Sequence, residues 1–446
     1  MKPTVILGLV LSALFLAIPI YYIGFEIEQK DSIPIIIAFT LAFGGYLYLV
    51  RIAATQKYKL LFWLIGLGVL LRVLLVFAFP TISDDIYRFM WDGRLLHEGI
   101  HPLSWKPSEL LAQGHLATNI TALYPYLNSQ EYYTVYPPLS QLVYYVSTIG
   151  ADWSWGTSSM TMKLILLLAE LGTAYFIYKI LAHFSISKWW LLVYFLNPLL
   201  IVELTGQLHF EGLMVSFLAG SIYMLIQKKH ILSGSLLAAS VAVKLLPLMF
   251  VPVIANYLWK KKGLKGFSIG FVGVMAILFI PFIFTLDFSH FFASINLYFQ
   301  KFEFNSSIYY LRRQLGYWLT GYNQIIIIGP LLTLISLWAI LRISLKRDSP
   351  ELRTVLKRMF YCFAIYLFLT TTVHPWYLTM LILLGVIENK WWPVVWSGVV
   401  VWSYTTYSHP DFEQNLFLIS IEYLIVFAFI FWEYRRWISQ RWFLKD

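Results

Sequence analysis

The sequence contains very little cysteine and few charged residues. Of its 446 residues only one, Cys362, is a cysteine, and only 13% are charged. A single cysteine excludes an intrachain disulfide and a zinc site built on thiolates, and its place inside an apolar run argues against redox chemistry. So little charge excludes an ordinary soluble domain. The apolar segments also lack the polar alternation of barrel strands.

Hydrophobic residues make up 59% of the sequence instead, and apolar runs of about 20 residues, the length of a transmembrane helix, recur along it. Because lipid offers no hydrogen-bond partners, each run must satisfy its own backbone as a helix. We therefore expect an all-α polytopic membrane protein, a single domain over 1–446, with its first span at about 4–23. The net charge of +10 comes from basic residues in short loops, so we expect no nucleic-acid partner.

The charges of the loops predict the orientation of the chain. The loop at 26–31 is acidic and the next short loop, at 51–59, is basic. By the positive-inside rule the amino terminus is cytoplasmic, and the third span, at about 58–79, leads to a long external loop at about 81–159. The apolar run at 139–149 in this loop is too short to cross a bilayer, so we expect an interfacial or re-entrant helix there.

Two apolar stretches must turn back inside the membrane to keep this orientation. The stretch 231–259 lies between two basic loops, so it must go out and return, turning at Lys244 to Pro247. Its arms rise only about 20 Å each at about 1.5 Å per residue, so the turn lies below the outer surface. The second turn is His374 to Trp376. With a second external segment at about 287–322, we expect about 12 to 14 helical elements and both termini in the cytoplasm.

The densest polar cluster follows the third span and begins with two adjacent carboxylates, Asp84 and Asp85. A carboxylate beside an apolar wall has a raised pKa and can act as a general base on a hydroxyl. The alternative is that Asp84 only N-caps a helix running toward His97. In that helix Asp85, Arg88 and Asp92 share one face, which favours a structural ion pair for Asp92.

Ionisable residues at membrane depth are costly and are therefore functional candidates. Lys244 would neutralise a departing phosphate, or pair with a carboxylate such as Glu203. His209 and Glu211 lie at another outer turn and would position a sugar. A divalent cation between them stays open as an alternative, although two ligands alone do not make a metal site.

Three further residues complete the candidates from the residues alone. Arg312 and Arg313, in the second external segment, would grip a phosphate bidentately or anchor the chain at lipid headgroups. His374 would line the same cavity or serve as a satisfied structural histidine.

These motifs resemble the GT-C class of membrane glycosyltransferases, and most closely the bacterial polyprenyl-phosphate-mannose-dependent mannosyltransferases. Each motif is short, and the resemblance rests on their order over most of the chain and on their common external placement. The matching segments are Asp84 to Arg94, Gly99 to Pro102, Tyr136 to Leu139, Asn197-Pro198 with His209 and Glu211, Lys244 to Pro247, and His374 to Tyr377.

The resemblance implies a GT-C-type bundle with a long first external loop and inverting transfer of a sugar from a polyprenyl phosphate. It also implies an external-loop aspartate as the base, which is Asp84 in this sequence, with Asp85 as its neighbour. Arg88 and Tyr136, inside the matching segments, join the substrate-binding candidates. We expect no cofactor and no metal, and a lipid-phosphate donor agrees with a chain in which no nucleotide-binding domain appears.

We therefore expect a mannosyltransferase of the bacterial inner membrane that works on the periplasmic side. Its partners would be a polyprenyl-phosphate sugar donor, a lipid or glycan acceptor, and membrane lipids. Such an enzyme has to orient the acceptor, take its proton and stabilise the charge that develops on the phosphate. Two alternatives stay open: a transporter or flippase for a lipid-linked saccharide, and a polymerase or ligase that uses a lipid-linked oligosaccharide.

Overall fold

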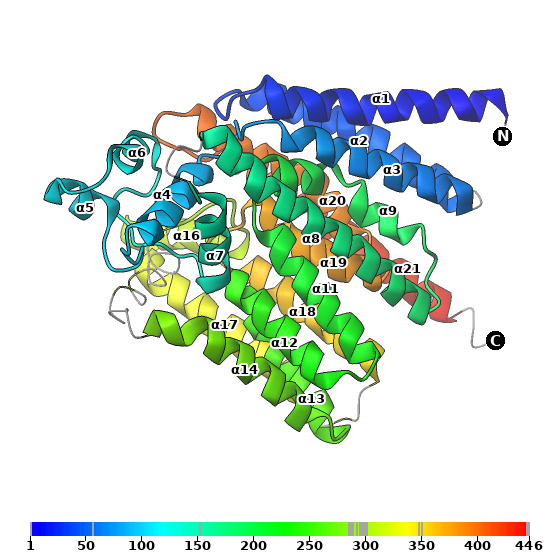
Figure 1. The fold of residues 1–446 in the computed structure, drawn as a ribbon. Coiled ribbons are helices and arrows are strands. Elements are labelled where there is room, and N and C mark those ends of the chain that lie inside the picture. Colours follow the sequence, from blue (N-terminus) through cyan, green and yellow to red (C-terminus); the bar gives the residue numbers. More distant parts are fainter. Residues whose placement is uncertain are drawn as a thin grey trace.

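The chain forms a bundle of helices with both termini at the same end (Figure 1). The computed structural model describes residues 2–55, 58–150, 154–283, 290, 293, 302–346, 348 and 351–442. Within these ranges there is no β-strand, and one isolated bridge joins Phe304 to Thr372. The predicted all-α polytopic fold is confirmed.

The first third of the chain builds one edge of the bundle and then the long loop. Three apolar helices lead into this loop, whose short helices gather at the end of the bundle opposite the termini, here called the loop end (Figure 1). The elements are α1 (Pro3–Phe25), α2 (Ser32–Thr55), α3 (Tyr58–Val76), α4 (Asp85–His97), α5 (Pro107–Gln113), α6 (Thr118–Thr121), η1 (Tyr124–Tyr126) and α7 (Pro138–Ser147).

The middle of the chain crosses the bundle several times and contains two breaks. A π-helical turn, η2, precedes the first break, and a 3₁₀ turn, η3, follows the second. The elements are α8 (Trp155–His183), α9 (Trp190–Phe195), α10 (Pro198–Leu200), η2 (Ile201–Gly206), α11 (Glu211–Ile226), α12 (His230–Val243), η3 (Leu246–Phe250), α13 (Val251–Lys260) and α14 (Leu264–Ile283).

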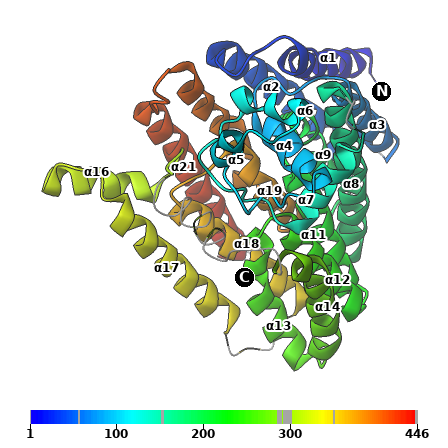
Figure 2. The ribbon, with the colours of Figure 1, turned by 60° about the vertical axis from the view of Figure 1, so that its left-hand side comes forward.

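The last third adds the outer flank, where α16 and α17 lie at the side of the bundle (Figure 2). The elements are α16 (Ile308–Thr320), α17 (Ile325–Ser344), α18 (Leu352–Leu369), η4 (Pro375–Tyr377), α19 (Leu378–Ile387), α20 (Trp392–Val399), η5 (Val400–Ser408) and α21 (Leu416–Trp442). Most of the predicted second external segment before residue 302 lies outside the described residues, and α16 occupies its remainder.

Among the residues that the structure describes, five helices are long and apolar enough to cross a membrane, namely α1, α2, α8, α17 and the first part of α21. A sixth candidate is the pair α10–η2 and α11, which is bent by 111° at the break between them. Shorter apolar helices of 10–17 residues, among them α12 and the segment Leu246–Lys260, accompany these spans. The total of about 12 to 14 helical elements stays a prediction.

The predicted turn at Lys244 is present, because α12 ends at Val243 and the chain resumes as η3. Ser140 of α7 donates a hydrogen bond to the Val243 carbonyl (2.9 Å), so this turn lies at the loop end. The turn at His374 is present too, between α18 and η4. At both turns a proline occupies the first helical turn that follows, where its missing N–H costs nothing.

The long loop contains the predicted short helix. The helix expected at 139–149 is α7, which has 10 residues. Gly93 lets α4 approach it closely, since a Cβ atom there would lie 2.5 Å from the Tyr144 carbonyl oxygen. Ser154 accepts a hydrogen bond from the Thr157 amide (3.2 Å) and starts α8 at Trp155, while the external bounds of the loop at about 81–159 stay a prediction.

Candidate active site

Two buried side chains fix the segment that leads from α3 to the acidic pair. The Lys163 ammonium donates to the carbonyls of Leu75 (3.0 Å) and Ala78 (2.7 Å), where α3 ends. The Gln207 side-chain oxygen accepts hydrogen bonds from the amides of Thr81 and Ile82, both at 3.1 Å. The backbone before Asp84 is therefore held by α8 on one side and by the break after η2 on the other.

Asp84 and Asp85 are half-buried and share one hydrogen-bond donor. The Asn128 amide donates to Oδ1 of Asp84 (2.8 Å) and to Oδ1 of Asp85 (3.1 Å), and the Tyr136 hydroxyl donates to Oδ2 of Asp85 (3.3 Å). Burial and then the charge of Asp85 raise the pKa of Asp84 from 3.8 to about 6, against the hydrogen bond from Asn128, which lowers it. Asp84 thus holds its proton near neutral pH more readily than an ordinary aspartate does.

The capping role considered for Asp84 is absent. A helix does run from Asp85 to His97, and Asp84 occupies its N-cap position, but its side chain makes no capping hydrogen bond. In the described part of the chain its carboxylate accepts a side-chain hydrogen bond from Asn128 through Oδ1 and a backbone hydrogen bond from its own residue, and no side chain donates to Oδ2.

Arg88 is buried, and its guanidinium forms hydrogen bonds within the long loop. Its Nε donates to Asp92 (2.8 Å) and its Nη1 to the carbonyl of Tyr132 (2.9 Å), and only 3% of its surface is exposed. Asp92 is fully buried and also accepts hydrogen bonds from Thr134 and Gln141. The predicted structural pairing of Asp92 with Arg88 is confirmed, and the structure presents Arg88 as support for the acidic pair rather than at an open surface.

Lys244, at the turn after α12, forms an ion pair with Glu211 at the start of α11. Its side chain remains 20% exposed, and an ammonium has three donors, so two are left for other partners. The structural partner named from the sequence, Glu203, is wrong, because Glu203 faces His209 instead.

Tyr144 of α7 connects this ion pair with the acidic pair. Burial raises the pKa of Tyr144 well above its ordinary value, and the nearby charges of Asp92, Asp85 and Glu211 raise it further. Its ring also packs edge-on against Phe210, in the break before α11, with the centroids 5.1 Å apart. The two groups of carboxylates therefore lie around one tyrosine at the loop end.

A stack of aromatic rings joins the break before α11 with the turn between α18 and η4. His209 lies on Trp376 with ring centroids 3.6 Å apart and planes 12° apart. Trp376 lies on His374 (4.5 Å, 3°), and His374 lies on Phe304 (4.5 Å, 26°). His209 and His374 are 165 residues apart in the sequence, yet they belong to one cluster.

The structure does not bring Arg312 and Arg313 together as one anion grip. Both lie on α16, where successive side chains point about 100° apart. Arg312 is exposed, whereas Arg313 pairs with Glu303 and lies over the Tyr310 ring at 4.5 Å. Neither contacts the cluster around Asp84 and Lys244 in the described residues.

His209 and Glu211, the two residues considered for a divalent cation, face different partners. His209 is paired with Glu203 and Glu211 with Lys244. Among the residues that the structure describes, no group of three metal-ligating side chains could hold a metal ion.

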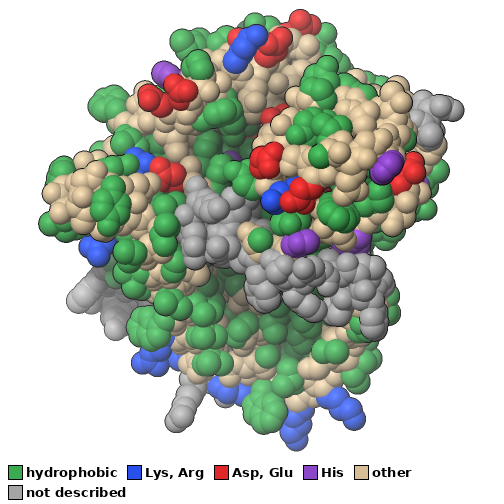
Figure 3. Space-filling model, turned by 90° about the vertical axis from the view of Figure 1, so that its left-hand side faces the viewer, with side chains coloured by type: hydrophobic (Ala, Val, Ile, Leu, Met, Phe, Trp, Pro, Cys, Tyr) green, Lys and Arg blue, Asp and Glu red, His purple; other side chains and the backbone are tan. Residues whose placement is uncertain are grey.

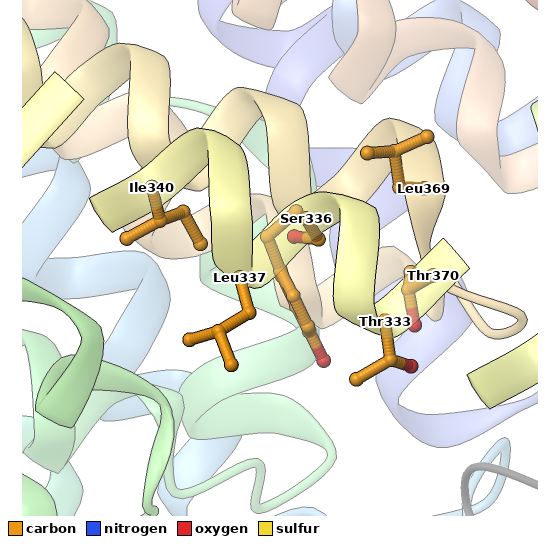
Figure 4. Close-up of a pocket in the computed structure, with 7 residues that line it drawn as sticks. Thr333, Ser336, Leu337, Ile340, Leu369 and Thr370 are labelled. Atoms are coloured by element: carbon orange, nitrogen blue, oxygen red, sulfur yellow. The ribbon is translucent and has the colours of Figure 1, made fainter. Parts of the chain in front are cut away.

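The loop end carries the acidic side chains on several sides of a hollow in its surface, while basic side chains gather along the lower margin of this face (Figure 3). A second hollow lies between α17 and α18 (Figure 4). Its lining has no charged side chain and consists of Thr333, Ser336, Leu337, Ile340, Tyr366, Leu369 and Thr370. We assign this second hollow no part in the chemistry.

The fold and the cluster together define a class: a polytopic membrane protein whose broken helices meet carboxylates, histidines and a lysine at one end of the bundle. Residues 28–260 match the profile of the family described as alpha-(1->6)-mannopyranosyltransferase, N-terminal domain. This match covers more than half of the chain, so the chain belongs to that family. The predicted resemblance to mannosyltransferases is thereby confirmed.

One curated relative is alpha-(1->6)-mannopyranosyltransferase A of Corynebacterium glutamicum, which is 24% identical over 208 residues. The alignment covers 42% of this chain and 39% of the relative, so the chain spans well under half the length of that protein. The family match includes Asp84, Asp85, His209 and Lys244 and ends before His374.

Sequence reasoning missed several members of the cluster. Asn128 gives no signal, since it is one polar residue in a polar loop. Gln207 did carry a signal, because it is a polar side chain at membrane depth two residues before His209. Tyr404, whose hydroxyl donates a hydrogen bond to Glu203, and the stacking role of Trp376 could not be found among so many aromatic residues.

Proposed function

We propose that the chain is a membrane glycosyltransferase that moves mannose from a polyprenyl-phosphate donor to a lipid or glycan acceptor at the loop end of the bundle. The observation that carries this proposal is the acidic pair: Asp84 has a pKa of about 6 and an Oδ2 atom that receives no side-chain hydrogen bond in the described residues, and it lies beside a buried polar cluster. Membership of a mannosyltransferase family supports the sugar and the reaction class.

In the proposed reaction, the acceptor hydroxyl oxygen attacks the anomeric carbon from the face opposite the phosphate. Its proton passes to the Asp84 carboxylate, and the electron pair of the breaking carbon–oxygen bond leaves with the polyprenyl phosphate. One carboxylate is enough for such an inverting transfer, unlike the paired carboxylates of hydrolases. A raised pKa suits the role, because a base works best with a pKa near the working pH.

Lys244 would receive the departing phosphate. Its ammonium lies at a turn inside the bundle, paired with Glu211 but with donors to spare, and a positioned cation stabilises charge that develops on a leaving oxygen. Tyr136 and Asn128 would orient the acidic pair, and Arg88 would hold the loop that carries them.

The linkage in the family description, together with the proposed inversion, leads to a proposal for the stereochemistry of the donor. It names an alpha-(1->6) linkage. An inverting enzyme forms an α-linkage only from a β-linked sugar phosphate, so β-mannosyl phosphate on a polyprenyl chain would be the donor and its α-anomer would be inert.

We place the site on the non-cytoplasmic side of a bacterial inner membrane. The long loop that carries the acidic pair is acidic overall, whereas short loops such as 51–59 and 260–265 are basic, which by the positive-inside rule supports opposite sides for them. A donor anchored in the membrane by its polyprenyl chain would bring its phosphate and sugar to the polar cluster at the loop end.

The test is to incubate the purified full chain with polyprenyl-phosphate β-mannose and a panel of lipid and glycan acceptors, with the α-anomer in parallel. We expect a mannosylated product from the β-anomer alone and at least about a hundredfold lower rate in Asp84→Asn, the usual scale of general-base catalysis. Movement of the intact donor across a vesicle membrane without transfer would identify a flippase instead. Transfer of a whole oligosaccharide from a lipid carrier would identify a polymerase or ligase.

A further inference from the structure

Three buried residues, His209, Glu203 and Tyr404, contact one another beside the break that follows the π-helical turn. Nδ1 of His209 lies 3.0 Å from the backbone oxygen of Glu203 and 3.0 Å from its Oε2 atom. The Tyr404 hydroxyl of η5 donates to the other carboxylate oxygen of Glu203. Each of the three residues is at most 1% exposed.

This arrangement determines the tautomer of His209. A backbone carbonyl accepts hydrogen bonds and cannot donate them, so Nδ1 must carry a proton. Nε2 then faces away from Glu203, and it is a buried nitrogen with no hydrogen-bond partner in the described part of the chain. Because buried polar atoms are almost always bonded in native proteins, Nε2 is expected to meet a ligand group or water when the site is filled.

The His209 ring lies between an acidic side chain and an aromatic ring. Oε2 of Glu203 lies 3.0 Å from Nδ1, and the indole of Trp376 covers one face of the ring with the centroids 3.6 Å apart. Lys244 and His209 both lie close enough to His374 to act on it electrostatically, so His209 and Lys244 belong to one cluster. The ammonium of Lys244 suits this cluster to a ligand that brings negative charge.

We propose that Tyr404 and Glu203 are positioning residues that hold Nδ1–H of His209 on the Glu203 carbonyl and direct Nε2, which is also protonated in the phosphate-bound state, to the phosphate oxygen that leaves the sugar. This inference rests on the proposed function and names a second phosphate contact beside Lys244. As the anomeric carbon–oxygen bond breaks, its electron pair goes to that phosphate oxygen, and the hydrogen bond from Nε2 strengthens with the growing charge. No proton has to leave His209, so the acceptor proton still goes to Asp84.

Binding of a short-chain polyprenyl phosphate, the product without sugar, tests this contact apart from catalysis. His209→Phe keeps a flat ring against Trp376 but removes both ring nitrogens, and should weaken binding by at least about tenfold, as expected for one charged hydrogen bond. The same substitution at His183, which is exposed at the end of α8, is the matched control and should bind like the wild type.

Binding of the donor that still carries its sugar separates a direct phosphate contact from a structural role of His209. A structural role would weaken the binding of both ligands equally. A phosphate monoester has a charge of about −1.5 to −2 near pH 7, whereas the sugar-linked diester has one negative charge. The loss of affinity in His209→Phe should therefore be greater for the polyprenyl phosphate than for the donor. Equal losses for both ligands would mean that the variant merely disturbs the pocket, and would overturn the inference.

The remaining outcomes are also decisive. A wild-type chain that fails to bind polyprenyl phosphate would overturn the donor class in the proposed function itself. Wild-type binding with an unaffected His209→Phe would overturn only the role of His209. If His209→Phe does not fold, Glu203→Gln and Tyr404→Phe replace it; both keep the side-chain shape, and unchanged monoester affinity in both would likewise reject the inference.

Discussion

Protonation of Asp84 should impose an acid limit on the transfer reaction. Burial and the charge of Asp85 raise the pKa of Asp84 from 3.8 to about 6. A general base acts only in its deprotonated form, so activity should be full above this pKa and fall as the pH drops through it. With a pKa of about 6, kcat/KM should fall about tenfold between pH 7 and pH 5, a range in which an ordinary aspartate stays ionised.

Two substitutions should move this limit in opposite directions. Asp85→Asn removes the neighbouring charge but leaves the burial, which is the larger cause, so the limit should move to lower pH and stay above 3.8. Asn128→Ala removes the hydrogen bond that stabilises the carboxylate, so the limit should move to higher pH. A general weakening of the enzyme would not separate the two variants in this way.

The assay is the initial rate of mannose transfer at low donor concentration from pH 4.5 to pH 8, with thermal stability measured at each pH. Glu98→Gln is the control, because Glu98 is an exposed carboxylate just beyond the end of α4 and should leave the profile unchanged. An Asp84→Asn variant that keeps both its rate and its acid limit would falsify the assignment of the base. A nearly active Asp84→Asn beside an inactive Asp85→Asn would move the base one residue along.

Three other predictions use the same protein. Lys244→Met should raise the donor KM or lower turnover by more than about tenfold, and unchanged kinetics in a folded variant would leave this lysine a purely structural ion-pair partner. Gln207→Met removes the oxygen that accepts from two amides before the acidic pair; it should lower kcat with little change in donor KM, and a change in KM alone would contradict a positioning role. Cysteines placed at Gln113 and Lys261 in a Cys362→Ser background should react with an impermeant thiol reagent from opposite sides, and labelling from the same side would refute the topology.

The sequence predicted the fold well because its signals were strong and local. Long apolar runs specify helices, and a short apolar stretch between two basic loops leaves no choice but a turn, which is why the Lys244 turn is where it was expected. The start of α8 depends on a local signal of another kind, the N-capping serine Ser154, which hydropathy does not detect.

The site was only partly predictable, because its pairings depend on packing between distant segments. The sequence marked Lys244 as unusual but offered two nearby glutamates, Glu203 and Glu211, as possible partners. The structure pairs Glu211 with Lys244 and Glu203 with His209, on either side of the 111° bend before α11. Asp92 could be paired with Arg88 from spacing alone, since four residues make one helical turn.

The breaks themselves explain why the chemistry is expected at this end of the bundle. Irregular backbone at membrane depth is tolerated only where protein buries it or where it lines a cavity. In this chain a π-helical turn, a left-handed Leu208 (φ 64°) and two 3₁₀ turns fall in three segments far apart in the sequence. A non-glycine residue in the left-handed region costs about 1–2 kcal/mol, which continuous helices would have avoided. Ring stacking and the carboxylates around Tyr144 bring these breaks to the same cluster as the acidic pair. Three separate interruptions that converge on one polar cluster are therefore consistent with a cavity that binds a substrate, where broken helices bring polar groups from distant segments together.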